Sequence, residues 1–158
     1  MTLEAGGAAV GAPVPPPALF AVGILVGFLL NVWIPLPLPI PILAARVSGG
    51  VLLLGGFALG LGAMRVLAEA ETSPVPHRPS RALVARGAYG ISRNPIYLGM
   101  ALLLTGVAVL ARSGWHLVML VLFVIAIDRL QIRREERYLE AKFGDDFRAY
   151  RSRVRRWI

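Results

Sequence analysis

The polar side chains that could do chemistry lie in two short stretches of an otherwise apolar chain. The first stretch ends with Arg93 and Asn94, directly before Pro95, and the second contains the neighbouring acids Glu135 and Glu136. Asparagine offers both hydrogen-bond donors and acceptors, and arginine and glutamate carry fixed charges at neutral pH. Such groups can bind and orient a polar ligand, so we take both stretches as candidate parts of a functional site.

Glu136 lies on an apolar face of a predicted helix. Ile132, Glu136, Leu139 and Phe143 are spaced +4, +3 and +4, which places them on one helical face, and Glu135 falls on the adjacent stripe. A carboxylate on an apolar face is unusual and marks a candidate functional group. The simpler alternative is that the two acids form exposed pairs with nearby arginines, each contributing only ~0–1 kcal/mol. The arginines in question are Arg133, Arg134 and Arg137.

Asn94 and Pro95 also have a simple structural interpretation. Proline is well suited to the first turn of a helix, where its missing N–H is harmless. Asn94 then occupies the N-cap position, and Arg93 extends toward the membrane surface. In this interpretation the stretch is only the capped start of a helix.

Composition excludes several other chemistries. The chain has 158 residues and no cysteine, which excludes disulfides, thiolate metal sites and a cysteine nucleophile. Its two histidines, His77 and His116, leave little for a zinc or haem site. Charged residues make up 16% of the chain, against about 25% in soluble domains, and 56% are hydrophobic. These values indicate one small, basic, membrane-embedded domain covering residues 1–158.

Four apolar blocks predict an all-α bundle of about four transmembrane helices followed by C-terminal cytoplasmic or interfacial helices. A helical span needs ~20 residues, and the blocks lack the polar face of a soluble helix. The first block is long enough alone, the next two need their flanks, and the fourth must borrow residues 128–130. The predicted spans are 18–34, 49–68, 96–111 and 114–130.

The connectors between the blocks have clear signals. Alternating prolines at 35, 37, 39 and 41 exclude a helix interior and predict an extended connector between the first two spans. Arg112, Ser113 and Gly114 predict a tight turn, so the third and fourth spans form an antiparallel hairpin. The stretch before the first span has no lysine or arginine, so we expect that span to be retained rather than cleaved as a secretory signal.

The C-terminal stretch predicts two helices separated at Gly144. Gly144 ends the first helix and Asp145 can cap the next. In the second helix Phe147, Tyr150, Val154 and Trp157 repeat at +3, +4 and +3 among many arginines, which is typical of an amphipathic helix at a membrane surface.

Arginine placement predicts the orientation in the membrane. Fifteen of the 17 basic residues lie in segments 65–93 and 129–158, and the opposite connectors hold only Arg46 and Arg112. By the positive-inside rule the first group faces the cytoplasm, together with both termini. The basic charge therefore needs no nucleic-acid partner, and no nucleic-acid-binding module is recognisable.

From about Pro74 onward the sequence resembles the isoprenylcysteine carboxyl methyltransferase and phospholipid methyltransferase superfamily of integral membrane enzymes. The resemblance rests on the order and spacing of short motifs. These are Leu83-Val84, Gly87-Ala88-Tyr89, Arg93-Asn94-Pro95-Ile96-Tyr97-Leu98-Gly99, Glu135-Glu136-Arg137-Tyr138-Leu139, Phe143-Gly144, Tyr150 and Val154-Arg155-Arg156-Trp157.

The resemblance implies an S-adenosylmethionine-dependent methyltransferase whose cofactor lies between the cytoplasmic helix ends and the C-terminal helices, in segments 74–99 and 128–158. Asn94 and Tyr97 would act by positioning, and no residue is assigned as a catalytic base. The implied cofactor-binding residues are Arg81, Ala82, Leu83, Val84, Tyr89, Asn94, Pro95, Tyr97, Glu135 and Glu136.

The resemblance also implies a lipophilic methyl acceptor. The carboxylate of an isoprenylcysteine-like compound is the first candidate, and a phospholipid amine is the alternative. Many members have histidine where this chain has Asn94, so a histidine base is excluded there. In the prenylcysteine enzymes an arginine before the paired acids contacts the substrate carboxylate. The corresponding candidates here are Arg129, Gln131 and Arg133.

Three other functions remain open at this level: a small transporter, a membrane reductase using a nicotinamide cofactor, and a non-catalytic relative. A transporter predicts ionisable residues within the spans. The notable polar groups there are Asn31, Thr105 and His116, and we interpret His116 as an interfacial residue rather than a proton relay. The related reductases are usually much longer chains.

Overall fold

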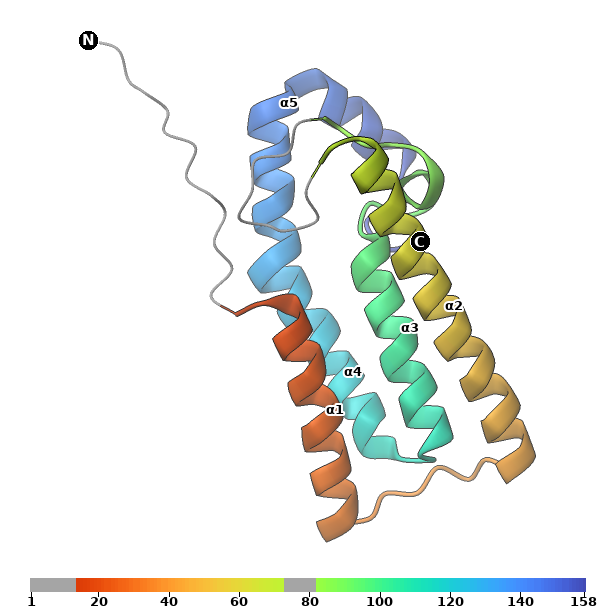
Figure 1. Cartoon of the computed structure of the whole chain (residues 1–158). Helices are drawn as coiled ribbons and strands as arrows, with labels where there is room; N and C mark the ends of the chain where they lie inside the picture. Colours follow the sequence, from red (N-terminus) through yellow and green to blue (C-terminus); the bar gives the residue numbers. More distant parts are fainter. Residues whose placement is uncertain (1–13, 73–81) are drawn as a thin grey trace.

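The computed structural model describes residues 14–72 and 82–158, and within these ranges the chain is helical and forms no sheet (Figure 1). The predicted all-α membrane helix bundle is confirmed. A 3₁₀ turn (η1, Gly87–Gly90) precedes α3, and a π-helical turn (η2, Asp128–Ile132) joins α4 to α5. The α-helices are α1 (Pro16–Trp33), α2 (Ile42–Glu69), α3 (Pro95–Leu110), α4 (Gly114–Ile127) and α5 (Arg133–Arg153).

Each of the four apolar blocks forms a helix, but their lengths differ from the prediction. Three helical segments are long and apolar enough to cross a membrane: α1, α2 and Gly114–Arg153, which comprises α4, η2 and α5. The fourth block, which looked too short, gains its length by running through η2 into α5, and α3 is the shorter helix. Helix α2 begins at Ile42, directly after Pro41, so Arg46 lies in the helix and not in the connector.

The helices pack in the order α1, α4, α3, α2, with neighbours antiparallel (Figure 1). The tightest contact joins α2 and α3 through glycines. A Cβ on Gly99 would lie 2.8 Å from the carbonyl oxygen of Gly56, and one on Gly106 would lie 3.1 Å from that of Gly49. Small residues let the two backbones approach closely, which is how membrane helices commonly associate.

The α1–α2 connector and the α3–α4 turn lie at the end of the bundle away from α5, and they are hydrogen-bonded to each other (Figure 1). The Leu38 N–H donates to the Arg112 carbonyl at 2.8 Å, and the Gly114 N–H donates to the Leu36 carbonyl at 2.7 Å. The proline-rich segment is therefore an extended connector, as predicted, and residues 111–113 form the predicted tight turn. Within this turn the backbone of Arg112 has a positive φ of 49°.

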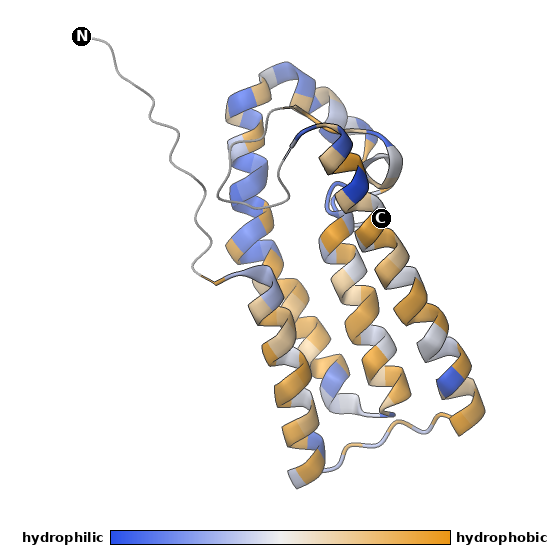
Figure 2. Ribbon diagram, in the orientation of Figure 1, coloured by the Kyte–Doolittle hydropathy of each residue, from blue (hydrophilic) through white to orange (hydrophobic). Residues whose placement is uncertain are grey.

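The polar and apolar residues separate along the bundle axis. Figure 2 shows mostly hydrophobic ribbon along α1 to α4 and a hydrophilic end formed by α5. Large apolar side chains stay exposed along the outer faces of the helices, which suits contact with lipid and not water. Examples are Val22, Leu25, Val51, Leu54 and Val121.

The C-terminal region differs from the predicted amphipathic helix. The break at Gly144 is confirmed, because its backbone adopts φ 51° and ψ −118°, a conformation that favours glycine. The helix ends at Arg153, however, and Val154 is extended, so Trp157 does not continue the helical face. Phe147 and Tyr150 are buried within the protein, at 1% and 3% exposure, and are not available to a membrane surface.

His116 is also placed differently from its interfacial interpretation. Its side chain is fully buried, lies edge-on to Phe28 with ring centres 4.5 Å apart, and packs against Gly27. A Cβ on Gly27 would come within 2.8 Å of the imidazole ring. His116 therefore fills space between α1 and α4.

Candidate functional site

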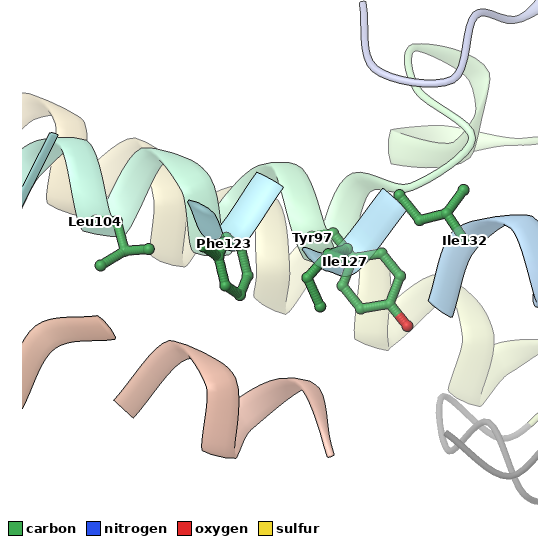
Figure 3. Close-up of a cluster of buried hydrophobic side chains, with 5 residues drawn as sticks. All are labelled: Tyr97, Leu104, Phe123, Ile127 and Ile132. Atoms are coloured by element: carbon green, nitrogen blue, oxygen red, sulfur yellow. The ribbon is translucent and has the colours of Figure 1, made fainter. Parts of the chain in front are cut away.

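A row of buried apolar side chains leads from the middle of the bundle to its polar end. Figure 3 shows Leu104, Phe123, Tyr97, Ile127 and Ile132 following one another along α3, α4 and η2. All five are at most 8% exposed. Packing of this core fixes the ring of Tyr97, whose hydroxyl is the polar atom at the end of the row.

The hydroxyl of Tyr97 meets the half-buried carboxylate of Glu135. It donates to Oε1 of Glu135 at 2.8 Å, and Nε2 of Gln131 donates to the same oxygen at 2.6 Å. Gln131 is 2% exposed, and its own carbonyl oxygen has no hydrogen-bond partner within the described residues. We call Tyr97, Gln131 and Glu135 the Glu135 centre. The centre thus places the carbonyl oxygen of Gln131, a hydrogen-bond acceptor without a partner among the described residues, beside the carboxylate of Glu135.

The electrostatics of the Glu135 centre are set by burial. Burial raises the pKa of Glu135 above its usual range, and the hydrogen bonds from Gln131 and Tyr97 only partly oppose this. Burial also raises the pKa of Tyr89, and the negative charge of Glu135 adds to that shift. Tyr89 is therefore electrostatically coupled to this carboxylate.

Glu136 faces a different set of partners. Arg93 donates to its Oε1 from Nε at 3.1 Å and from Nη2 at 2.8 Å. Arg156 donates to Oε1 from Nε at 3.2 Å and to Oε2 from Nη2 at 2.5 Å. We call Arg93, Glu136 and Arg156 the arginine clasp. The partners come from residues 43 and 20 positions away and not from the adjacent arginines of α5.

The clasp keeps Glu136 ionised. Burial alone would raise its pKa, but the hydrogen bonds and charges of Arg156 and Arg93 outweigh burial and hold the pKa below its usual value. The Arg93 and Glu136 side chains are only 10% and 12% exposed. The position of Arg93 before α3 had predicted that its side chain extends toward the membrane surface. This prediction is wrong, because the side chain lies in the interior, bound to Glu136.

The C-terminal residues 154–158, which we call the strap, lie against the start of α3. The Arg93 N–H donates to the Arg155 carbonyl at 3.0 Å. The Arg156 carbonyl accepts from Ser92 Oγ at 3.2 Å and from Asn94 Nδ2 at 3.0 Å. Asn94 does occupy the N-cap position, but its side chain binds the strap and does not cap the helix. Trp157 of the strap packs against the apolar row.

A second contact joins η1 to α5. The Tyr150 hydroxyl donates to the Tyr89 carbonyl at 2.7 Å, and burial raises the pKa of Tyr150 to about 12. This bond holds the turn that carries Tyr89 against the helix that carries Glu135. Its physical role is to bring the two sequence stretches together.

The other predicted site residues are more scattered. Arg81 lies outside the described residues. Ala82 is exposed and its N–H donates to Thr72 Oγ1 at 3.2 Å, whereas Leu83 and Val84 are half-buried. Pro95 is fully buried at the start of α3. Among the predicted substrate residues Gln131 belongs to the Glu135 centre. Arg129 is exposed, and Arg133 pairs with Asp128 at 2.9 Å.

Sequence reasoning missed the clasp itself. It named Arg93 and Arg156 as parts of motifs but gave neither a partner. The available signal was that the motifs with Arg93, Glu136 and Arg156 all belong to the pattern of the resemblance. Helical periodicity could not pair residues that belong to different elements.

These features are those of a polytopic helical membrane protein with a half-buried, hydrogen-bonded carboxylate at its polar end. The family model for phospholipid methyltransferases matches residues 44–146, and the chain belongs to this family, within the isoprenylcysteine carboxyl methyltransferase-like superfamily. An uncharacterized protein of Haemophilus influenzae is 38% identical over 63 residues, which are 40% of this chain and all of that protein. No solved structure matches the chain significantly.

Family membership supports the coarse part of the predicted function. The family is one of membrane-bound methyltransferases, and such enzymes generally use S-adenosylmethionine. The matched range includes all three residues of the Glu135 centre.

Proposed function

We propose that the chain transfers a methyl group from S-adenosylmethionine to a lipophilic acceptor at the polar end of the bundle. The observation that carries this proposal is the Glu135 centre. No described arginine or lysine pairs with Glu135, and Gln131 keeps a buried carbonyl oxygen without a partner. Among the described residues this half-buried carboxylate meets only neutral donors, and removing a carboxylate from water without a cation is costly unless a ligand supplies one.

The chemistry of this centre suits the cofactor. S-adenosylmethionine carries a sulfonium and an ammonium group, and its ribose hydroxyls need acceptors. When bound it supplies an electrophilic methyl group. Glu135 would face a cationic group, Gln131 would accept a hydrogen bond, and Tyr97 would hold Glu135 in place.

The remaining wall of the proposed cofactor site combines both sequence stretches. Glu136 belongs to it as a support, because the clasp engages both of its oxygens. The residues proposed beside the Glu135 centre are Arg81, Ala82, Leu83, Val84, Tyr89, Asn94 and Pro95.

The acceptor group is the finer part of the proposal. An isoprenylcysteine-like carboxylate needs no proton removed, and the exposed Arg129 and Arg133 could receive it at the rim. In the described interior, however, Arg93 and Arg156 are already engaged by acids. A substrate carboxylate would also be repelled by an ionised Glu135.

We propose a phospholipid amine as the acceptor, because it avoids both problems. Its ammonium form would be attracted to the Glu135 centre. The raised pKa of Glu135 makes this carboxylate a better proton acceptor than an ordinary glutamate. The family name, phospholipid methyltransferase, is consistent with this choice.

The chain's contribution to the reaction is alignment. Methyl transfer is an in-line displacement, and holding two reactants in line can supply ~7–11 kcal/mol of the barrier. The buried Tyr97 and Ile132 exclude water from one side, and the exposed apolar helices allow a lipid to approach from the membrane. With the arginine-rich end on the cytoplasmic side, the cofactor would enter from the cytoplasm.

The test is a transfer assay with methyl-labelled donor and the full chain in nanodiscs. Phosphatidylethanolamine and a farnesylcysteine analogue are offered separately, with Glu135→Gln as the matched inactive control. Labelled phospholipid from the wild type supports the amine acceptor, and labelled farnesylcysteine ester supports the carboxylate. Absence of label in both, from protein shown to be folded, would refute the proposed function.

A further inference from the structure

We propose that Arg93 and Arg156 are positioning residues that act through Glu136 to set the orientation of Glu135. This inference rests on the proposed function, because Glu135 is the group it serves. Arg93 and Arg156 do not touch the Glu135 centre, and their effect passes through the adjacent residue of α5.

Two cross-links join the start of α3 to the start of α5. One is ionic, from Arg93 to Glu136 at 2.8 Å, and the other is the hydrogen bond from Tyr97 to Glu135 at 2.8 Å. Adjacent residues of an α-helix point about 100° apart. The two contacts therefore hold α5 from two directions and fix its rotation about its own axis.

The guanidinium of Arg93 is well suited to this task. Besides its two bonds to Glu136, its Nη1 donates to the carbonyl oxygens of Arg151 at 3.1 Å and Val154 at 2.8 Å. One planar group thus ties the beginning of α5 to its end and to the strap. Lysine carries its charge on a single ammonium nitrogen instead of a planar group with three nitrogens. It therefore cannot bind Glu136 and the two carbonyl oxygens together.

Arg156 is the second support of Glu136. It binds Glu136 through two nitrogens, and its Nη1 donates to Asp128 at 2.9 Å in the π-helical turn. Asp128 precedes Gln131 by three residues in η2. The clasp therefore fixes both the turn that presents Gln131 and the helix that presents Glu135.

The experiment is a double-mutant cycle on S-adenosylmethionine affinity, measured by calorimetric titration of the full chain in nanodiscs. The variants are Arg93→Lys, Tyr97→Phe and the double substitution. Arg148→Lys is the matched control, because Arg148 pairs with the exposed Asp145 on the same helix. Thermal unfolding of each variant is recorded in parallel.

We expect Arg93→Lys to weaken binding at least about tenfold, and to weaken it less than about threefold when Tyr97 is already phenylalanine, because interacting residues are not additive. Arg148→Lys leaves the affinity unchanged. A purely structural role lowers the unfolding temperature of Arg93→Lys while the folded protein binds normally, and that result overturns the proposal. Equal effects of Arg93→Lys in both backgrounds overturn it too.

Two further outcomes keep the inference separate from the proposed function. If the wild type binds no S-adenosylmethionine, the proposed function fails and the positioning role that rests on it is overturned with it. If Arg93→Lys does not fold, Arg156→Lys takes its place in the same cycle. That variant keeps the better-buried Arg93–Glu136 pair, and additivity with Tyr97→Phe would again overturn the inference.

Discussion

Replacing Glu136 by glutamine should destabilise the protein more than any other single loss of charge in α5. Glutamine has nearly the same shape but no charge, so packing is preserved and only the electrostatics change. Arg93 would be left almost buried without its counter-ion, at 10% side-chain exposure. Arg156 would keep its second partner, Asp128, at 2.9 Å.

The size of the effect follows from this geometry. Removing one partner of a fully buried ion pair costs about 3–5 kcal/mol. Here the cost is smaller, because Arg156 is one-third exposed and Arg93 keeps two backbone carbonyl acceptors. We expect about 2–3 kcal/mol, which for a chain of this length corresponds to a fall of roughly 5–10 °C in Tm.

Thermal unfolding of the detergent-purified chain measures this shift. Asp145→Asn is the control: it removes a charge from an ion pair on the same helix, but its side chain is 95% exposed, so no shift is expected. A Glu136→Gln variant as stable as wild type, or a control equally destabilised, would show that burial of the clasp does not contribute to stability.

Three other predictions concern pH and helix packing. The folded-state pKa of Glu136 is depressed, so its contribution to stability is present above its unfolded pKa of 4.5 and is lost as pH falls through the folded value. Acid unfolding of Glu136→Gln should therefore lack this component. The folded pKa of Glu135 is raised, so S-adenosylmethionine affinity should fall with decreasing pH already above pH 4.5, and Glu135→Gln should remove that dependence in titrations. Gly99→Ala would push a Cβ to 2.8 Å from the Gly56 carbonyl and should cost about 1–3 kcal/mol of unfolding free energy, whereas Gly55→Ala, with open space around it, should cost none.

Most of the fold could be predicted because its signals are local. Apolar blocks, the prolines before α2 and Gly144 each act within a few residues of the feature they determine. The end of α5 could not be predicted in this way. Apolar residues after Arg153 keep helical spacing. The backbone carbonyls of residues 154–156, however, bind Arg93, Ser92 and Asn94, which are distant in sequence, and these bonds hold the segment in a non-helical conformation.

The candidate site was predicted by residue type more than by arrangement. The resemblance to the methyltransferase superfamily predicted that Tyr97 and Glu135 belong to one cofactor site. In the structure one hydrogen bond joins the two side chains. The roles of the paired acids could not be separated from sequence, because both lie at the start of one helix. In the structure their partners differ: Glu135 meets neutral donors, and Glu136 meets two arginines.

The side chains of Asn94 and His116 also have partners that their sequence positions do not indicate. Asn94 has the right position to cap α3, yet the strap offers its amide a carbonyl at 3.0 Å. His116 lies at the edge of an apolar block, where an interfacial role is usual, but Gly27 leaves a space on α1 that its ring fills. In both residues a partner from another element decides the outcome.

Calorimetric titration of the full chain in nanodiscs measures whether the Glu135 centre binds S-adenosylmethionine. We predict saturable binding to the wild type at one site, weakened strongly in Glu135→Ala and Tyr97→Ala and unchanged in the surface variant Arg148→Lys. Absence of binding to the folded wild type, or equal binding to wild type and Glu135→Ala, would exclude the Glu135 centre as the cofactor site.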